Sequence, residues 1–168
     1  MSAQKVSLST WVNQPQDANV AQQETQKFSR FDGVELAKVG TWAALTGTLK
    51  LSAADLAAAV AAAPRLPRIP IKIGHTDSRF DGEPALGWVE NLRTTNRGTV
   101  LVGDIVDVPV WLASSLPTAY PRRSIEAIQN YERDGATYRF VLTALSLLGV
   151  TAPAINDLNQ LQQLLERK

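Results

Sequence analysis

The chain has 168 residues, of which 45% are hydrophobic, so it is long enough for one domain with a substantial core and short appendages. Its 17 basic and 16 acidic residues give a formal net charge of +1, which argues against a general nucleic-acid binder, because such proteins carry a basic excess. Cysteine is absent, which excludes disulfides and cysteine nucleophiles, and no apolar run is long enough to span a bilayer.

Residues 1–32 are polar and rich in Gln, Ser and Asn, which predicts a mobile N-terminal arm. The alternative is an arm that docks on a neighbour through its few aromatic side chains, Trp11, Phe28 and Phe31. No basic stretch followed by an apolar one is visible, so no secretory signal is predicted. The folded domain is predicted to span residues 33–154 and to begin with a strand.

A helix is predicted from Ser52 to Ala63. Ser52 is a suitable N-cap, Asp55 lies near the positive end of the helix dipole, and the alanine-rich run that follows has high helix propensity. Pro64 is expected to end the helix.

Isoleucines then alternate with other residues over positions 68–74, which predicts a strand. His75 follows Gly74 and continues the same alternation, which places it on the isoleucine face. A polar loop is expected over residues 76–84. Its acidic side chains do not match the spacing of a calcium loop, so we interpret it as solvated.

Two more strands are predicted over residues 85–93 and 99–106, joined by a turn at 95–98. Pro109 suits the start of a short helix over residues 110–116, with Trp111 as its apolar anchor. Residues 124–131 and 137–147 then form a hairpin around the turn residues Asp134 and Gly135.

In the first arm of that hairpin, Ser124 and Glu126 share one face, and Ile125 lies on the other. Ser124 is therefore expected on the less buried side of the sheet. A last helix is predicted over residues 155–168, capped by Asn156 or Asp157. Its apolar stripe is the set Leu158, Leu161, Leu164 and Leu165.

Three runs of sequence resemble a known family: residues 74–89 (GHTDSRFDGEPALGWV), 119–126 (AYPRRSIE) and 142–154 (LTALSLLGVTAPA). In this order they look like the capsid maturation (prohead) proteases of tailed bacteriophages, which are related in fold to the herpesvirus assembly protease. The resemblance covers roughly residues 34–154. It implies an α+β fold built on a short, mostly antiparallel β-barrel flanked by helices.

The resemblance also implies a serine endopeptidase with Ser124 as nucleophile and His75 as general base. A serine hydroxyl is a poor nucleophile and needs a base within hydrogen-bond reach, a task that histidine suits. His75 is the only histidine in the chain. The competing interpretation of a lone histidine on an apolar strand is a structural core residue.

The family implies polypeptide substrates: phage scaffolding protein, major capsid protein and the chain itself. The setting is the assembling prohead in the cytoplasm of the bacterial host. No nucleic acid, membrane or cofactor is implied, and no Walker loop, dinucleotide glycine pattern or zinc spacing is present. The cleavage motif is left open, as is whether the chain is a processed or truncated product.

A third group usually orients the histidine of a serine hydrolase. The herpesvirus relatives use a second histidine, which this chain lacks, and other phage proteases use an acid on the strand after the nucleophile, where residues 141–147 have none. Thr143, Ser146, Glu126 and Asp77 all remain candidates. Arg122 and Arg123 are either solvated charges or support for the oxyanion.

The alternative function is a non-catalytic barrel module that binds scaffold or capsid protein during assembly. A homodimer is also left open, because the leucine stripe after residue 155 suits either self-association or packing on the chain's own barrel. Packing on its own barrel is the expectation here.

Overall fold

The computed structural model describes residues 28–44, 46–75, 82–161 and 163. Strands are β1 (Phe28–Lys38), β2 (Gly40–Ala44), β3 (Gly47–Leu51), β4 (Ile69–Ile73), β5 (Trp88–Thr95), β6 (Val100–Pro109), β7 (Arg122–Arg133) and β8 (Ala136–Leu148). Helical segments are α2 (Ala53–Ala62), the 3-10 turn η1 (Ala63–Arg65), α3 (Val110–Ala113) and α4 (Leu116–Ala119).

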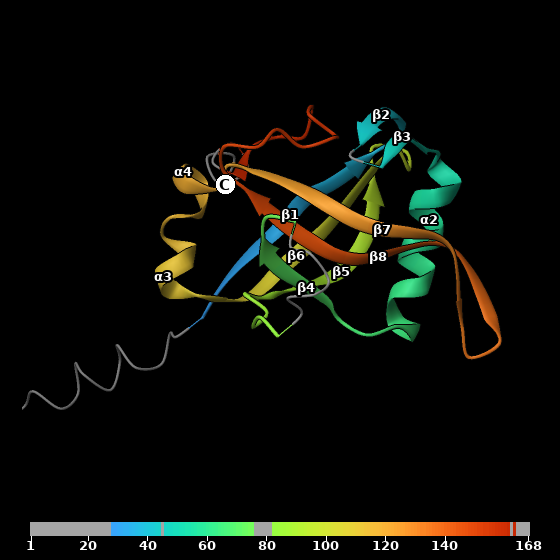
Figure 1. The fold of residues 1–168 in the computed structure, drawn as a ribbon, viewed down its shortest axis with the longest axis horizontal. Helices are drawn as coiled ribbons and strands as arrows, with labels where there is room; N and C mark the ends of the chain where they lie inside the picture. Colours follow the sequence, from blue (N-terminus) through green and yellow to red (C-terminus); the bar gives the residue numbers. More distant parts are fainter. Residues whose placement is uncertain (1–27, 45, 76–81, 162, 164–168) are drawn as a thin grey trace, which may run out of the picture.

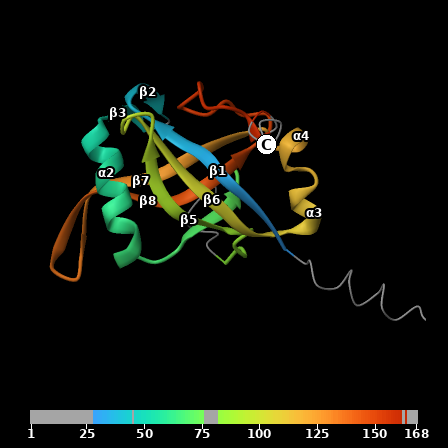
Figure 2. The ribbon, with the colours of Figure 1, turned by 180° about the vertical axis from the view of Figure 1, so that it is seen from behind.

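Six strands form one sheet in the order β1-β6-β5-β4-β8-β7, and β2 and β3 pair separately. All neighbouring strands of the large sheet are antiparallel except β4 and β8, which are parallel. Helix α2 lies at one end of the molecule and α3 and α4 at the other (Figures 1 and 2). The predicted α+β class is confirmed, and the described chain is mostly strand with few helices.

The sheet curls back on itself but does not close into a barrel. Strands β7 and β8 lie on the near side in Figure 1, whereas β1 lies on the near side in Figure 2. In the described part of the chain, no hydrogen-bonded ladder joins the two edge strands β1 and β7. The closed β-barrel expected from the sequence is therefore not what this sheet forms.

Register shifts in the pairings of β1 and β5 with β6 accompany this curl, and two of them are tied to one side chain. The β1–β6 register shifts between Phe31 and Val34, and the β5–β6 register shifts between Glu90 and Arg93. Asp104 of β6 bonds to both places: Oδ1 accepts from Gly33 N at 2.9 Å and Oδ2 accepts from Asn91 Nδ2 at 2.9 Å. Because bulges bend a strand and increase its twist, these two sites favour a curled sheet.

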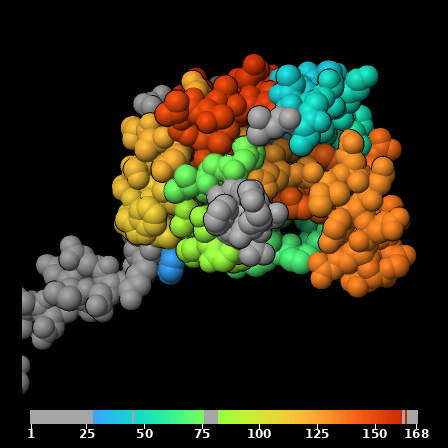
Figure 3. All heavy atoms as spheres, in the orientation of Figure 1, coloured from blue at the N-terminus to red at the C-terminus, as the bar shows by residue number. Residues whose placement is uncertain are grey.

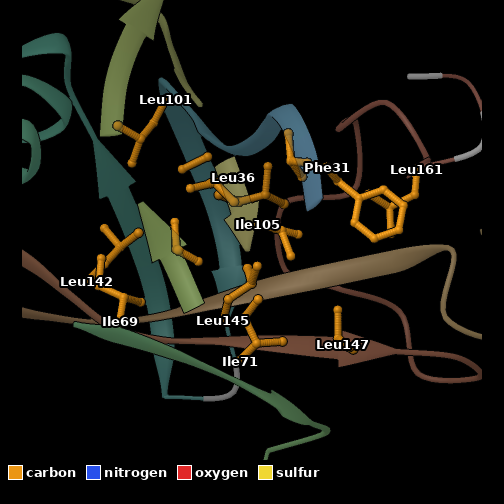
Figure 4. Packing of buried hydrophobic residues seen from close by; sticks show 14 of the residues in the cluster. Phe31, Leu36, Ile69, Ile71, Leu101, Ile105, Leu142, Leu145, Leu147 and Leu161 are labelled. Carbon is orange, nitrogen blue, oxygen red and sulfur yellow. The ribbon is translucent and has the colours of Figure 1, made fainter. Parts of the chain in front are cut away.

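The core lies between the two sides of the curled sheet. Figure 4 shows Leu36 of β1, Ile105 of β6, Ile71 of β4 and Leu145 of β8 converging on it, and all four are fully buried. The predicted alternation of β4 is confirmed for Ile69 and Ile71, but Ile73, at the end of the strand, is 37% exposed.

Helix α2 begins as predicted. Ser52 is the N-cap: its Oγ accepts from Asp55 N at 3.2 Å, and Asp55 Oδ2 accepts from Ser52 N at 2.8 Å. This reciprocal pair is a capping box. Asp55 Oδ1 also accepts from Arg139 Nε of β8 at 2.7 Å, which ties the start of the helix to the hairpin.

Three predictions about the ends of the chain and the short helix are wrong. Strand β1 starts at Phe28, inside the predicted arm, and Phe31 belongs to the core. Trp111 is not the apolar anchor of the short helix, because its side chain is 65% exposed at the start of a four-residue helix. The C-terminal helix does not begin at Asn156 or Asp157, since residues 155–160 are irregular and helical backbone appears only at Leu161.

The C-terminal segment instead covers the seam between β1 and β7. Arg123 of β7 donates from Nε to Glu35 O of β1 at 2.6 Å and from Nη2 to Asn159 O at 2.8 Å. Asn159 in turn donates from N and Nδ2 to the Glu35 carboxylate at 2.9 and 2.8 Å. Leu161 then enters the cluster that contains Phe31 (Figure 4).

Arg123 is therefore neither a solvated charge nor an oxyanion donor, the two roles weighed from sequence. It is 2% exposed, and burial lowers the pKa of its guanidinium to about 10 despite the nearby charge of Glu35. Within the described ranges, no helix has the length and apolar character needed to cross a membrane.

Candidate active site

Three polar side chains lie in a row across three adjacent strands. Lys72 of β4 is the register partner of Ser146 of β8, and Ser146 is the register partner of Ser124 of β7. Directly paired residues of neighbouring strands share a face of the sheet. Strand β8 lies between β4 and β7, so it brings the two predicted catalytic segments together.

His75 joins this row from the end of β4. Gly74 has a φ of 66°, a left-handed conformation that glycine adopts at little cost. Its backbone N still bonds to Leu147 O at 2.9 Å. The predicted side for His75, among the isoleucines, is wrong, because the chain turns at Gly74 and returns the ring to the Lys72 face.

The ring of His75 is held by Glu126. Nδ1 lies 2.8 Å from Glu126 Oε1. Because an ionised carboxylate only accepts hydrogen bonds, the neutral ring has its hydrogen on Nδ1 and its lone pair on Nε2. This is the tautomer that a histidine base requires in a serine hydrolase.

A single oxygen of Glu126 receives several donors. Besides His75, Oε1 has Lys72 Nζ at 2.8 Å and accepts from Ser146 Oγ at 3.1 Å. Burial by itself would raise the pKa of Glu126, but the hydrogen bonds from Lys72, His75 and Ser146 outweigh it and the pKa is lowered. Glu126 is therefore ionised at neutral pH.

Ser146 contacts both His75 and Glu126. Its Oγ lies 3.3 Å from His75 Nδ1 as well as 3.1 Å from Glu126 Oε1. The residue is fully buried, so a substrate carbonyl cannot reach it, and it is not a second nucleophile.

Ser124 is half-buried on the same face, two residues from Glu126 along β7. No hydrogen bond joins Ser124 Oγ to His75 among the described residues. Catalytic hydrogen bonds are often long in enzymes without substrate, so this separation alone does not decide the role of Ser124.

The remaining candidate residues either make no hydrogen bond to His75 or lie outside the residues that the structure describes. Thr143 occupies the register shift between Ala144 and Leu142 and makes no hydrogen bond to His75 within the described chain. Asp77 lies outside the described residues. Arg122 is exposed at the start of β7. Of the four candidates for the third group, Glu126 and Ser146 contact the ring.

Sequence reasoning did not single out Lys72. Its one signal was a cationic side chain in a strand of alternating isoleucines, opposite in parity to Ile71 and Ile73. That pattern is equally typical of any surface strand position, so it does not indicate a site without knowledge of the neighbouring strand.

A shallow hollow opens beside the start of β7, with a volume of about 270 Å³. Pro121, Arg122 and Arg123 line one side, and Pro153, Ile155 and Leu158 are among the residues opposite. Ser124 follows Arg123 in the chain but is not among the residues that line the hollow.

In the part of the chain that the structure describes, no group of three or more His, Cys, Asp or Glu side chains could hold a metal ion. Comparison of the chain with protein-family models, curated proteins and solved structures gives no significant match.

Proposed function

We propose that this protein is a serine endopeptidase in which Ser124 is the nucleophile, His75 the general base and Glu126 the group that orients the base. The observation that carries the proposal is the 2.8 Å contact between His75 Nδ1 and Glu126 Oε1, on the face of the sheet that also presents Ser124. This replaces the acid that other phage proteases carry on the following strand.

In the proposed reaction, Ser124 Oγ attacks the peptide carbonyl carbon while His75 Nε2 takes the hydroxyl proton. The ionised Glu126 stabilises the imidazolium that forms. The same proton then passes to the leaving amine as the C–N bond breaks, which leaves an acyl-enzyme. A water molecule, deprotonated by Nε2, releases the acid and restores Ser124.

The sequence resemblance supplies the proposed biological role: maturation cleavage of phage scaffolding protein, capsid protein and the chain itself inside a prohead. It rests on the three runs at residues 74–89, 119–126 and 142–154. As part of the same proposal, the curled sheet is a variant of the herpesvirus-protease barrel whose seam is spanned by the Arg123 side chain.

A fluorophosphonate probe tests the activity, because it labels a serine only when an adjacent base activates it. We expect labelling of the intact chain that disappears in Ser124→Ala and falls by at least about 100-fold in His75→Ala. Ser114→Ala is the matched control, since Ser114 is exposed at the end of α3 and should leave labelling unchanged. Undiminished labelling of folded Ser124→Ala would remove Ser124 as nucleophile.

The second candidate function is the non-catalytic binding module. The observation that favours it is the missing hydrogen bond between Ser124 and His75 in the described chain. A folded protein that binds scaffolding protein, leaves it uncut and resists the probe at every pH would support this module against the peptidase.

A further inference from the structure

Lys72 is the charged group closest to the carboxylate that holds His75. Its Nζ lies 2.8 Å from Glu126 Oε1, the same oxygen that contacts His75 Nδ1. The Lys72 side chain is 22% exposed, and those of Glu126 and His75 are each 29% exposed. The contact is therefore partly shielded from solvent, which weakens screening by salt.

Backbone pairing fixes where this ammonium lies. Lys72 is held in the parallel ladder between β4 and β8, opposite Ser146. Ser146 is small and buried, so the lysine and glutamate side chains can meet above it from strands on either side. The glutamate is thus fixed on one oxygen by a lysine from β4 and a serine from β8.

The position of Lys72 also has an electrostatic consequence. When His75 takes a proton, the Glu126 carboxylate attracts the new imidazolium, and the Lys72 ammonium that contacts the same carboxylate oxygen repels it. Without the ammonium, Glu126 would act on His75 with its full charge, and the protonated ring would be favoured.

We propose that Lys72 is a positioning residue, which fixes Glu126 Oε1 toward His75 and balances the carboxylate charge so that Nε2 stays unprotonated and available as base. The catalytic part of this inference rests on the proposed function, whereas the effect on His75 itself does not. Lys72 acts through Glu126 and does not touch the substrate.

The single histidine makes a direct test practical, because an untagged chain gives one set of imidazole resonances. Titration by ¹⁵N NMR should show the Nδ1–H tautomer in the neutral ring. Lys72→Met should raise the pH midpoint of the His75 titration by at least about half a unit. Lys72→Arg, which keeps the charge, should leave the midpoint within about 0.2 units of the native value.

A double-mutant cycle tests whether the effect passes through Glu126. We expect Lys72→Met to lower the rate of fluorophosphonate labelling at pH 6 at least about twofold in the native background. In the Glu126→Gln background, the same substitution should lower the rate by a smaller factor, because only the direct effect of the ammonium on the ring remains. Thermal melting of each variant establishes that it is folded.

The two proposals can fail separately. A raised NMR midpoint in Lys72→Met with no labelling of the native chain would support the positioning role and overturn the peptidase. Normal Ser124 labelling with an unmoved midpoint and pH profile in folded Lys72→Met would overturn the positioning role alone. Equal losses of rate in both backgrounds would likewise overturn an action through Glu126.

Discussion

The carboxylate of Asp104 accepts hydrogen bonds from both strands that flank β6, so one buried acid holds two bends of the sheet. Arg30 Nη2 and Arg93 Nη1 also donate to it, at 2.8 and 3.1 Å. Burial alone would raise the pKa of Asp104, but the hydrogen bonds from Asn91, Gly33 and Arg93 lower it.

We expect Asp104→Asn to lower the free energy of unfolding by about 1–3 kcal/mol at pH 7, because an amide cannot accept all four donors. A carboxyl whose pKa is lowered on folding stabilises the protein above its unfolded pKa and loses that effect as the pH falls through the folded value. The stability difference between the native chain and the variant should therefore shrink as the pH falls below the ordinary pKa of a carboxyl group.

Chemical denaturation across this pH range measures the effect. Asp134→Asn is the control, since Asp134 is a 90% exposed turn residue and asparagine also accepts its positive φ. A difference between Asp104→Asn and the native chain that persisted unchanged at pH 2.5 would contradict the role of the ionised carboxylate.

How much of the site could be read from the sequence depends on the residue. Ser124, Glu126 and their shared face follow from strand alternation, which is local. The choice of Glu126 over Thr143 as the group that orients His75 does not follow from strand alternation. It requires knowing that β8 lies between β4 and β7. The side of His75 was missed because a left-handed glycine overrides alternation.

At the scale of elements, α2 shows how two contacts to one carboxylate can contribute unequally to stability. Asp55 closes the capping box with Ser52 and also pairs with Arg139. The side chain of Arg139 is 60% exposed, whereas that of Asp55 is 10% exposed. A pair with one partner so open to water contributes little to stability.

Ser52→Ala should therefore lower the free energy of unfolding by about 1 kcal/mol, the usual cost of losing an N-cap hydroxyl. Arg139→Ala should cost less than about 0.5 kcal/mol. Urea denaturation of the two variants gives the ranking. A larger loss in Arg139→Ala would mean that the link to β8, and not the cap, holds the start of α2.

Elements with a local signal were predictable and those without one were not. The Asp134–Gly135 turn and the Ser52 cap are predicted by the local residue types alone, and both are confirmed. The C-terminal segment has leucines at helical spacing, but residues 155–160 are irregular where Asn159 bonds to Glu35 and Arg123. Those partners lie too far away in sequence for any local pattern to indicate them.

At the scale of the whole molecule, the seam between β1 and β7 is closed by side chains and by the C-terminal segment. The hairpin end of β7 and β8 projects from the opposite side of the body, as Figure 3 shows. Leu161, 1% exposed, is the last described residue of the segment that packs into the core.

We expect Leu161→Glu to lower the melting temperature at every protein concentration, because it buries a charge in the chain's own core. The size of the protein in solution, measured by sedimentation, should not change. Gln163→Glu is the matched control, since it adds the same charge at an exposed position. A variant that kept its melting temperature when dilute and passed from dimer to monomer would point instead to a subunit interface.

The strand order also dictates when the site can exist during synthesis. His75 follows β4 and Ser124 lies in β7, but β8, which is made after both, lies between these two strands. A nascent chain whose residues 136–148 are still inside the ribosome exit tunnel cannot insert β8, and so cannot bring Glu126 to His75. If the chain is a peptidase, the order of translation keeps it inert until its whole domain has emerged.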